Sequence, residues 1–176
     1  MLKTIALVAF AGVAVLLVAA SFRPDTFRVQ RSVRIAAPAA AVHPLINNLA
    51  QMNSWSPFVK RDPNLKGSYR GPSAGAGAGY DFQGNREVGS GSLDILASAP
   101  EKVTLRLHMR EPMEGVNTVE FLLVPQGDTT EVTWAMHGPT PYVSKLLGMV
   151  MDMDKMIGGA FESGLAELKQ RAERRA

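Results

Sequence analysis

The chain has 176 residues and no cysteine, which excludes disulfides, thiolate zinc sites and cysteine nucleophiles. Once an uncharged N-terminal segment is set aside, the remainder is long enough for one domain that needs no covalent cross-links. The formal net charge of +3 comes from scattered arginines without a recognition-helix, zinc-finger or aromatic RNA-binding pattern, so no nucleic-acid partner is indicated.

The segment from Thr4 to Phe22 carries no charge and consists mainly of Ala, Val and Leu. At about 1.5 Å per residue, its helix comes close to the roughly 30 Å of bilayer hydrocarbon, which favours a single-pass anchor in the cell membrane. Val18-Ala19-Ala20 also suits cleavage of a signal peptide, which leaves the protein secreted or periplasmic. The sequence therefore predicts an anchor or signal over residues 1–23, with the side of the membrane undecided.

Residues 27–35 alternate apolar and polar side chains as in a half-buried strand, except that Arg31 falls on the apolar face. Pro38 occupies the favoured first position of a following helix, which Pro44 is expected to kink or split. The run 53–58 predicts a turn with two aromatic side chains, because a proline ends the helix there.

A glycine-rich connection over residues 71–79 follows a short strand at 66–70. Beyond it, period-two alternation recurs between turn residues. The strands expected there are 79–83, 89–97, 102–110, 116–124 and 129–137. This spacing predicts an antiparallel meander with one apolar face.

The segment from Tyr142 to about Arg174 carries an apolar stripe at helical spacing and predicts one long helix. A curved sheet wrapped around this helix buries both apolar faces in two layers. We therefore expect an α+β fold of the helix-grip type over residues 24–176.

Three stretches carry a resemblance to a known family: residues 53–58, residues 80–91 with their Gly84-Asn85 and Gly89-Ser90-Gly91 turns, and residues 153–165. They resemble the START-like superfamily, also called SRPBCC, in its bacterial polyketide cyclase/dehydrase and lipid-transport-like branch. The resemblance covers about residues 27–170. It implies a cavity between sheet and helix for apolar or amphipathic ligands, and no catalytic set carries over residue by residue.

In this architecture a pocket lined by aromatic and methionine side chains is the expected binding site, although each such side chain is equally compatible with ordinary core. The candidates are Trp55, Phe58, Tyr80, Phe82, Phe121, Trp134, Met149, Met153 and Phe161. Arg31 either holds a ligand carboxylate or phosphate, pairs with a protein carboxylate, or reaches solvent. The Gly158-Gly159 pair inside the helix costs about 1 kcal/mol per residue relative to alanine, which indicates close backbone packing or room for a ligand.

Recognisable catalytic and cofactor motifs are missing from the sequence. His43, His108 and His137 form no metal-ligand spacing, and there is no P-loop, dinucleotide fingerprint or nucleophile elbow. The sequence therefore indicates neither a metal nor a cofactor.

The leading hypothesis from the sequence is a membrane-tethered binding domain for an apolar or amphipathic small molecule or lipid. A second is a cyclase- or dehydrase-like enzyme, for which Tyr80, Arg31 and Asn117 are the available polar groups. A third is a protein-interaction module without a ligand. An enzyme would need a polar acid or base inside the cavity, and two of these groups within hydrogen-bonding reach in one cavity would favour this hypothesis.

Overall fold

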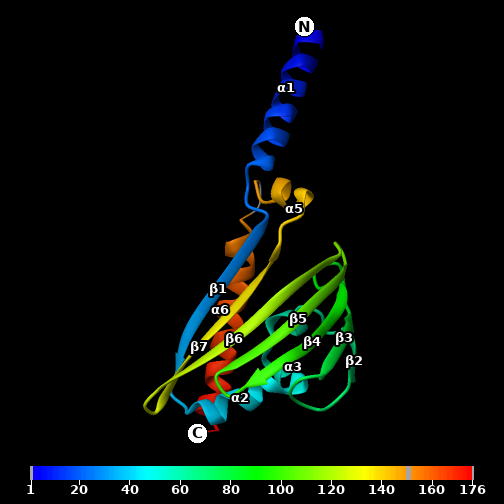
Figure 1. Ribbon diagram of the computed structural model, residues 1–176. Helices are drawn as coiled ribbons and strands as arrows, with labels where there is room; N and C mark the ends of the chain where they lie inside the picture. Colours follow the sequence, from blue (N-terminus) through cyan, green and yellow to red (C-terminus); the bar gives the residue numbers. More distant parts are fainter. Residues whose placement is uncertain (1, 150–151, 176) are drawn as a thin grey trace.

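The computed structural model describes residues 2–149 and 152–175, and its seven strands form one antiparallel sheet (Figure 1). The strands are β1 (Thr26–Ile35), β2 (Lys66–Arg70), β3 (Gly79–Gln83), β4 (Ser90–Ala99), β5 (Lys102–Glu111), β6 (Gly115–Gln126) and β7 (Thr129–Pro139). Their order across the sheet is β1-β7-β6-β5-β4-β3-β2. Strands β2 to β7 therefore pair with their sequence neighbours, which confirms the predicted meander.

Alternation along the strands gives the sheet one apolar and one polar face. On β5, Val103 and Leu105 are fully buried. Arg106 lies on the opposite face of the strand and is exposed. Arg31 lies on the inner, apolar face of β1, as the sequence pattern indicates, because its register partner on β7 is the buried Trp134.

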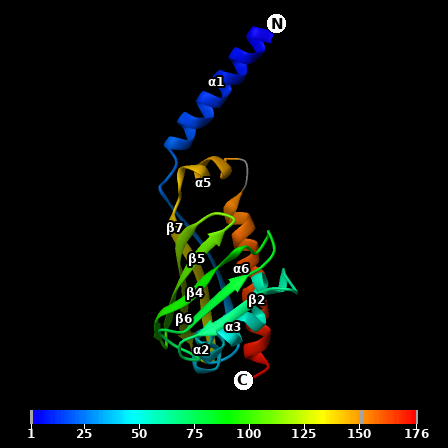
Figure 2. The same ribbon diagram turned by 90° about the vertical axis from the view of Figure 1, so that its right-hand side faces the viewer.

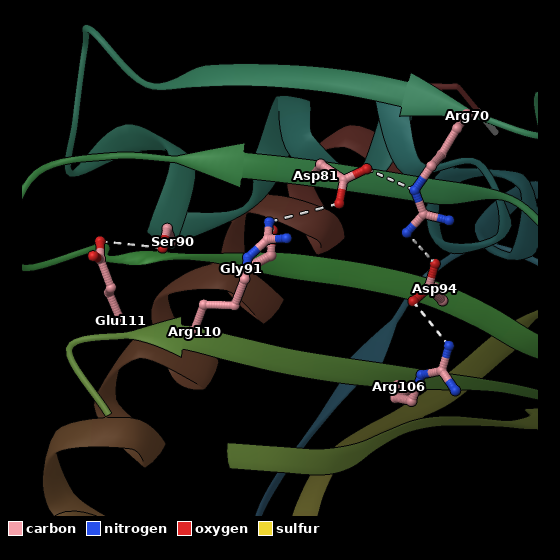
Figure 3. Close-up of polar contacts among 8 residues, drawn as sticks. All are labelled: Arg70, Asp81, Ser90, Gly91, Asp94, Arg106, Arg110 and Glu111. Carbon is pink, nitrogen blue, oxygen red and sulfur yellow. Dashed lines mark hydrogen bonds and ion pairs between the residues drawn. The ribbon is translucent and has the colours of Figure 1, made fainter. Parts of the chain in front are cut away.

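Alternating charges cover the outer face of β2 to β5 (Figure 3). Arg70 Nε lies 2.6 Å from Asp81 Oδ2, and Arg70 Nη2 lies 2.5 Å from Asp94 Oδ1. Arg106 reaches the other oxygen of Asp94 at 3.3 Å, and Arg110 reaches Asp81 at 3.7 Å. Exposed pairs of this kind contribute about 0–1 kcal/mol each, so they mark this face as a solvated surface with compensated charge.

Three short helices link β1 to β2: α2 (Ala39–Asn47), α3 (Leu49–Trp55) and α4 (Pro57–Lys60). Pro44 lies inside α2, so it does not split this helix. The division falls at Asn48 instead, whose side chain accepts a hydrogen bond from Gln51 N at 3.0 Å and begins α3. The predicted turn over residues 53–58 is also wrong, because Pro57 starts a further helical turn at its favoured first position.

The helix predicted from Tyr142 to Arg174 is two helices, α5 (Tyr142–Leu147) and α6 (Met153–Glu173). Gly148 caps the end of α5. Asp152 caps the start of α6, where its side chain accepts a hydrogen bond from Lys155 N at 3.0 Å. Glycine and aspartate are common helix-terminating and helix-starting residues, and here they outweigh the apolar periodicity that runs across them.

Helix α1 (Leu2–Ser21) extends away from the sheet, with its C-terminal end beside α5 (Figure 1). Tyr142 Oη donates a hydrogen bond to Leu17 O at 2.6 Å, and Arg23 Nη1 donates to Gly148 O at 3.2 Å. The part of the chain that the structure describes contains no helix long and apolar enough to cross a membrane, so the predicted single-pass anchor over residues 4–22 and the cell-membrane localisation are wrong.

Helix α6 runs along the inner side of the sheet and packs mainly against β1 (Figures 1 and 2). Arg31 joins the two elements, since its Nε lies 2.7 Å from Glu162 Oε1 and its Nη2 lies 2.9 Å from Asp154 Oδ2. A Cβ on Gly158 would collide with the Arg31 guanidinium, so this glycine makes room for the side chain. Gly158 therefore allows α6 to pack closely against the Arg31 side chain.

The Arg31 pairing predicts a pH-dependent contribution to stability. Hydrogen bonds from Arg31 lower the pKa of Asp154 below its ordinary value. A carboxylate with a lowered folded-state pKa stabilises the fold above its unfolded pKa of about 3.9, and this contribution is lost as the pH falls through the lowered value. We expect Arg31→Met to reduce the free energy of unfolding near neutral pH, by an amount that shrinks as the solution is acidified.

Urea denaturation at a series of pH values measures this difference. Arg28→Met is the matched control, because Arg28 lies on the outer face of the same strand, with its side chain 47% exposed and 3.7 Å from Glu120. A difference between wild type and Arg31→Met that stays constant across the acidic range would contradict the assignment.

A second prediction uses two glycines of α6 with opposite surroundings. A Cβ on Gly164 would lie 2.7 Å from Trp134 Cζ3 and 2.9 Å from Pro57 Cδ, whereas one on Gly159 would meet nothing within 4 Å. We expect Gly164→Ala to destabilise the fold by about 1–3 kcal/mol through overpacking. Gly159→Ala should stabilise it by about 0.5–1 kcal/mol through helix propensity. Thermal or urea unfolding of the two variants checks the opposite signs, and equal effects would refute the packing argument.

Candidate ligand site on the inner face of the sheet

Four predicted site residues from four elements meet beneath α6. The Trp134 ring of β7 stacks on Phe161 of α6, with ring centroids 4.2 Å apart and planes at 10°. The ring centroid of Phe121 on β6 lies 5.0 Å from that of Trp134. The ring of Trp55 on α3 meets Trp134 edge-on, with centroids 5.7 Å apart. Trp55 and Phe121 are 0% exposed, Phe161 is 1% exposed and Trp134 is 6% exposed. This group, the aromatic cluster, fills the space between helix and sheet.

The two tryptophans of the cluster differ in their hydrogen bonding. Trp55 Nε1 donates to Leu45 O at 2.9 Å, which satisfies the indole and holds α3 against α2. Trp134 Nε1 is buried and has no hydrogen-bond partner among the described residues. An unpaired buried donor is uncommon in native proteins.

Phe58 extends the cluster towards its border. Its ring meets Trp134 edge-on at 6.3 Å and is half-buried, and the Arg61 guanidinium lies 5.4 Å from the ring centroid. The short helix α4 that carries Phe58 is held to α6 by an exposed ion pair, in which Lys60 Nζ lies 2.8 Å from Glu167 Oε1. Phe58 is thus the least enclosed of the aromatic rings around Trp134.

Tyr80 and Phe82 form a second group on β3, near the β2 edge of the sheet. Their rings stack at 6.2 Å, and Tyr69 of β2 lies 4.8 Å from Tyr80. The Tyr80 ring covers Gly67, where a Cβ would collide with it. Burial raises the pKa of Tyr80 above its ordinary value and so disfavours its phenolate further.

Some apolar side chains of the inner face are less completely covered. Half-buried apolar side chains pack against the core there: Phe58, Phe82, Leu93, Leu107 and Ile157. Leu93 of β4 pairs in register with Tyr80 on one side and Leu107 on the other, so the surface runs continuously across β3, β4 and β5. We call these five side chains the apolar border.

The remaining predicted site residues lie apart from the aromatic cluster. Met149 follows α5 and is half-buried. Met153 is the first residue of α6, and its side chain is not among those that the structure describes. Arg31 is adjacent to Trp134 but is engaged by Asp154 and Glu162, which is the carboxylate pairing considered from the sequence.

The polar groups nominated for catalysis do not form a pair. Tyr80 lies on β3, Arg31 on β1, and the Asn117 side chain on β6 sits over Gly138, where a Cβ would collide with its amide. No hydrogen bond between any two of these three side chains occurs in the described part of the chain. The arrangement therefore offers no acid–base couple.

A buried carboxylate was missed by the sequence reasoning. Asp62 is 7% exposed and accepts hydrogen bonds from Asn64 N at 2.9 Å and from Asn85 N at 2.6 Å. It ties the end of α4 to the connection between β3 and β4. An aspartate before Pro63-Asn64 is a turn signal that could have revealed it.

Two surface depressions lie elsewhere on the molecule. One is lined by Thr26, Phe27, Arg28, His137 and Gly138, and the other by five residues of the N-terminal segment, Ala14, Val15, Val18, Ala19 and Phe22. Neither is lined by a residue of the aromatic cluster or the apolar border. Trp134 is 6% exposed and its Nε1 is buried, so a ligand that reached this nitrogen would require a side chain to move.

Comparison with known proteins identifies the fold. A family model described as polyketide cyclase / dehydrase and lipid transport matches residues 26–173. No curated protein matches the sequence significantly.

Among solved structures, one from Thermobifida fusca is 24% identical with a TM-score of 0.59, and the match covers 84% of this chain and 93% of that one. Norcoclaurine synthase from Thalictrum flavum, solved with dopamine and hydroxybenzaldehyde, is 12% identical with a TM-score of 0.59 over 81% of this chain and 86% of its own. The Aha1 dimer from Colwellia psychrerythraea is 14% identical with a TM-score of 0.59 over 84% and 96%.

These structural likenesses, all below 25% identity, show the fold and agree with the START-like resemblance of the sequence. The family model adds the assignment, since it spans every strand of the sheet and the whole of α6. The chain belongs to the polyketide cyclase / dehydrase and lipid transport family.

Proposed function

We propose that this domain binds an apolar or amphipathic small molecule on the inner face of the sheet, beside α6. The observation that carries the proposal is the apolar border, whose side chains are only half-buried next to a fully packed aromatic cluster. Apolar surface that the protein leaves partly in water is stabilised when a ligand covers it, by about 25 cal/mol for each Å².

Membership of the family supports this site over other surfaces. The family's description includes lipid transport, and norcoclaurine synthase, which has the same fold, was solved with two small aromatic molecules. The proposed contacts in this chain are Phe58, Phe82, Leu93, Leu107 and Ile157 at the border, with Tyr80 beside them and Trp134 behind Phe58.

Binding has more support than catalysis. A cyclase or dehydrase needs a positioned acid or base at the reacting atoms. Burial raises the pKa of Tyr80 and so disfavours its phenolate as a base, and Arg31 is already paired with two carboxylates. Among the described residues, the site therefore has an apolar surface, and Tyr80, Arg31 and Asn117 form no hydrogen-bonded pair.

Two leucines of β4 provide the test. Leu93 belongs to the apolar border, whereas Leu96 on the same strand is 50% exposed and lies outside it. We expect Leu93→Lys to weaken binding of the uncharged fluorescent probe N-phenylnaphthylamine by at least about tenfold, because the bound probe would desolvate an ammonium group. Leu96→Lys should leave the affinity unchanged.

Fluorescence titration of the full-length chain measures the affinity, with circular dichroism to show that both variants are folded. If both variants bound the probe as wild type does, the probe would lie elsewhere and the proposed site would be wrong.

A further inference from the structure

The indole N–H of Trp134 has no acceptor of its own. Its nitrogen is buried and makes no hydrogen bond within the described part of the chain, whereas the equivalent group of Trp55 donates to Leu45 O at 2.9 Å. Burying a donor without a partner destabilises the fold, and native proteins therefore seldom retain one. The two indoles of one cluster thus differ in the property that matters for recognising a polar atom.

The ring neighbours of Trp134 are aromatic: Trp55, Phe58, Phe121 and Phe161. The carboxylates of Asp154 and Glu162 are engaged by Arg31, which lies opposite Trp134 on β1. Among the described residues none accepts a hydrogen bond from the indole, and a bound molecule with an acceptor atom would satisfy it.

Among the rings around Trp134, that of Phe58 is the one whose movement would let a ligand reach Trp134. The other three aromatic neighbours of Trp134 are at most 1% exposed, but Phe58 is half-buried on a helix of 4 residues. Its contacts outside the cluster are the exposed Arg61 guanidinium and, through α4, the exposed Lys60–Glu167 pair. A rotation of Phe58 would connect Trp134 with the apolar border without disturbing the sheet.

The charge around the site selects the kind of acceptor. Arg31, the cation opposite Trp134 on β1, is already paired with two carboxylates, so it is not available to compensate an anionic ligand. A charged group in an apolar environment without a partner is strongly disfavoured, whereas a carbonyl oxygen needs a single donor.

We infer that the Trp134 indole N–H donates a hydrogen bond to one uncharged acceptor oxygen, such as a ketone carbonyl, on an otherwise apolar ring-containing ligand admitted past Phe58. This inference rests on the proposed function, because it names the polar atom that the same apolar site would recognise.

A pair of probes with the same apolar body tests it: naphthalene, which has no acceptor, and acetylnaphthalene, which adds one ketone oxygen. The chain has 2 tryptophans, so proton–nitrogen NMR spectra of the labelled full-length protein contain two indole signals. We expect acetylnaphthalene to move the Trp134 indole proton downfield and naphthalene to leave it without that shift. The Trp55 signal, already hydrogen-bonded to Leu45 O, is the internal control.

Affinities give an independent measurement. In each protein the measured quantity is the ratio of the affinity for acetylnaphthalene to the affinity for naphthalene. This ratio should be about five- to tenfold larger in wild type than in Trp134→Phe, as expected for one neutral hydrogen bond. Trp134→Phe keeps an aromatic ring, removes the donor and reduces the size of the side chain, and it also assigns the NMR signals. If this variant does not fold, the wild-type spectra alone decide.

The outcomes separate the two proposals. If both probes bind and the Trp134 signal shows no downfield shift specific to the ketone, the indole is not the recognising group, and the proposed apolar site stands. A Trp134 signal held unchanged by a buried water gives this same result. If neither probe binds, the proposed function is wrong and the inference with it.

Discussion

Trp134 is the point at which the layers of this domain are joined. Its ring lies between β1 and β6 in the sheet, stacks on Phe161 of α6, and meets Trp55 of α3 and Phe58 of α4 edge-on. Aromatic pairs of this kind contribute about 0.5–1.5 kcal/mol beyond the area they bury. Because so many elements meet at one ring, its size and orientation determine how far α6 and α4 stand from the sheet.

Arg31 complements this contact from the neighbouring position on β1. The aromatic stacking brings α6 onto the sheet, and the pairing of Arg31 with Asp154 and Glu162 sets where along β1 the helix lies. An ion pair is directional in a way that apolar contact is not, since it requires particular atoms to meet. The helix therefore has one position along the strand that satisfies both interactions.

Most of the sheet could be predicted from the sequence, because strand alternation is a local pattern and turn residues separate its repeats. The strict alternation of β5 and the apolar-face position of Arg31 are both present in the structure. The helices were harder, because their ends depend on single capping residues. Asn48 and Asp152 each start a helix through one side-chain hydrogen bond, and a stripe of apolar residues does not reveal that bond.

The candidate site was predictable only as a set of residue types. The sequence indicated aromatic residues on inward-facing positions, but their separation into the aromatic cluster around Trp134 and the Tyr80–Phe82 group depends on which strands α6 covers. The partial burial of the apolar border has the same origin. Leu93, Leu107 and Ile157 are ordinary core residues by pattern, and only the tertiary arrangement leaves them half-buried.

The glycines of this domain have a consequence for how its sequence can change. Gly67 lies under Tyr80, Gly158 beside Arg31, and Gly164 against Trp134, and each lacks room for a methyl group. Each pair therefore has a shared volume, so the residue allowed at one position depends on the size of the other. Substitutions at these positions are expected to occur together in related proteins, with a smaller side chain at 134 accompanied by alanine at 164. The spacing between α6 and the sheet thus depends on pairs of residues that are expected to change together.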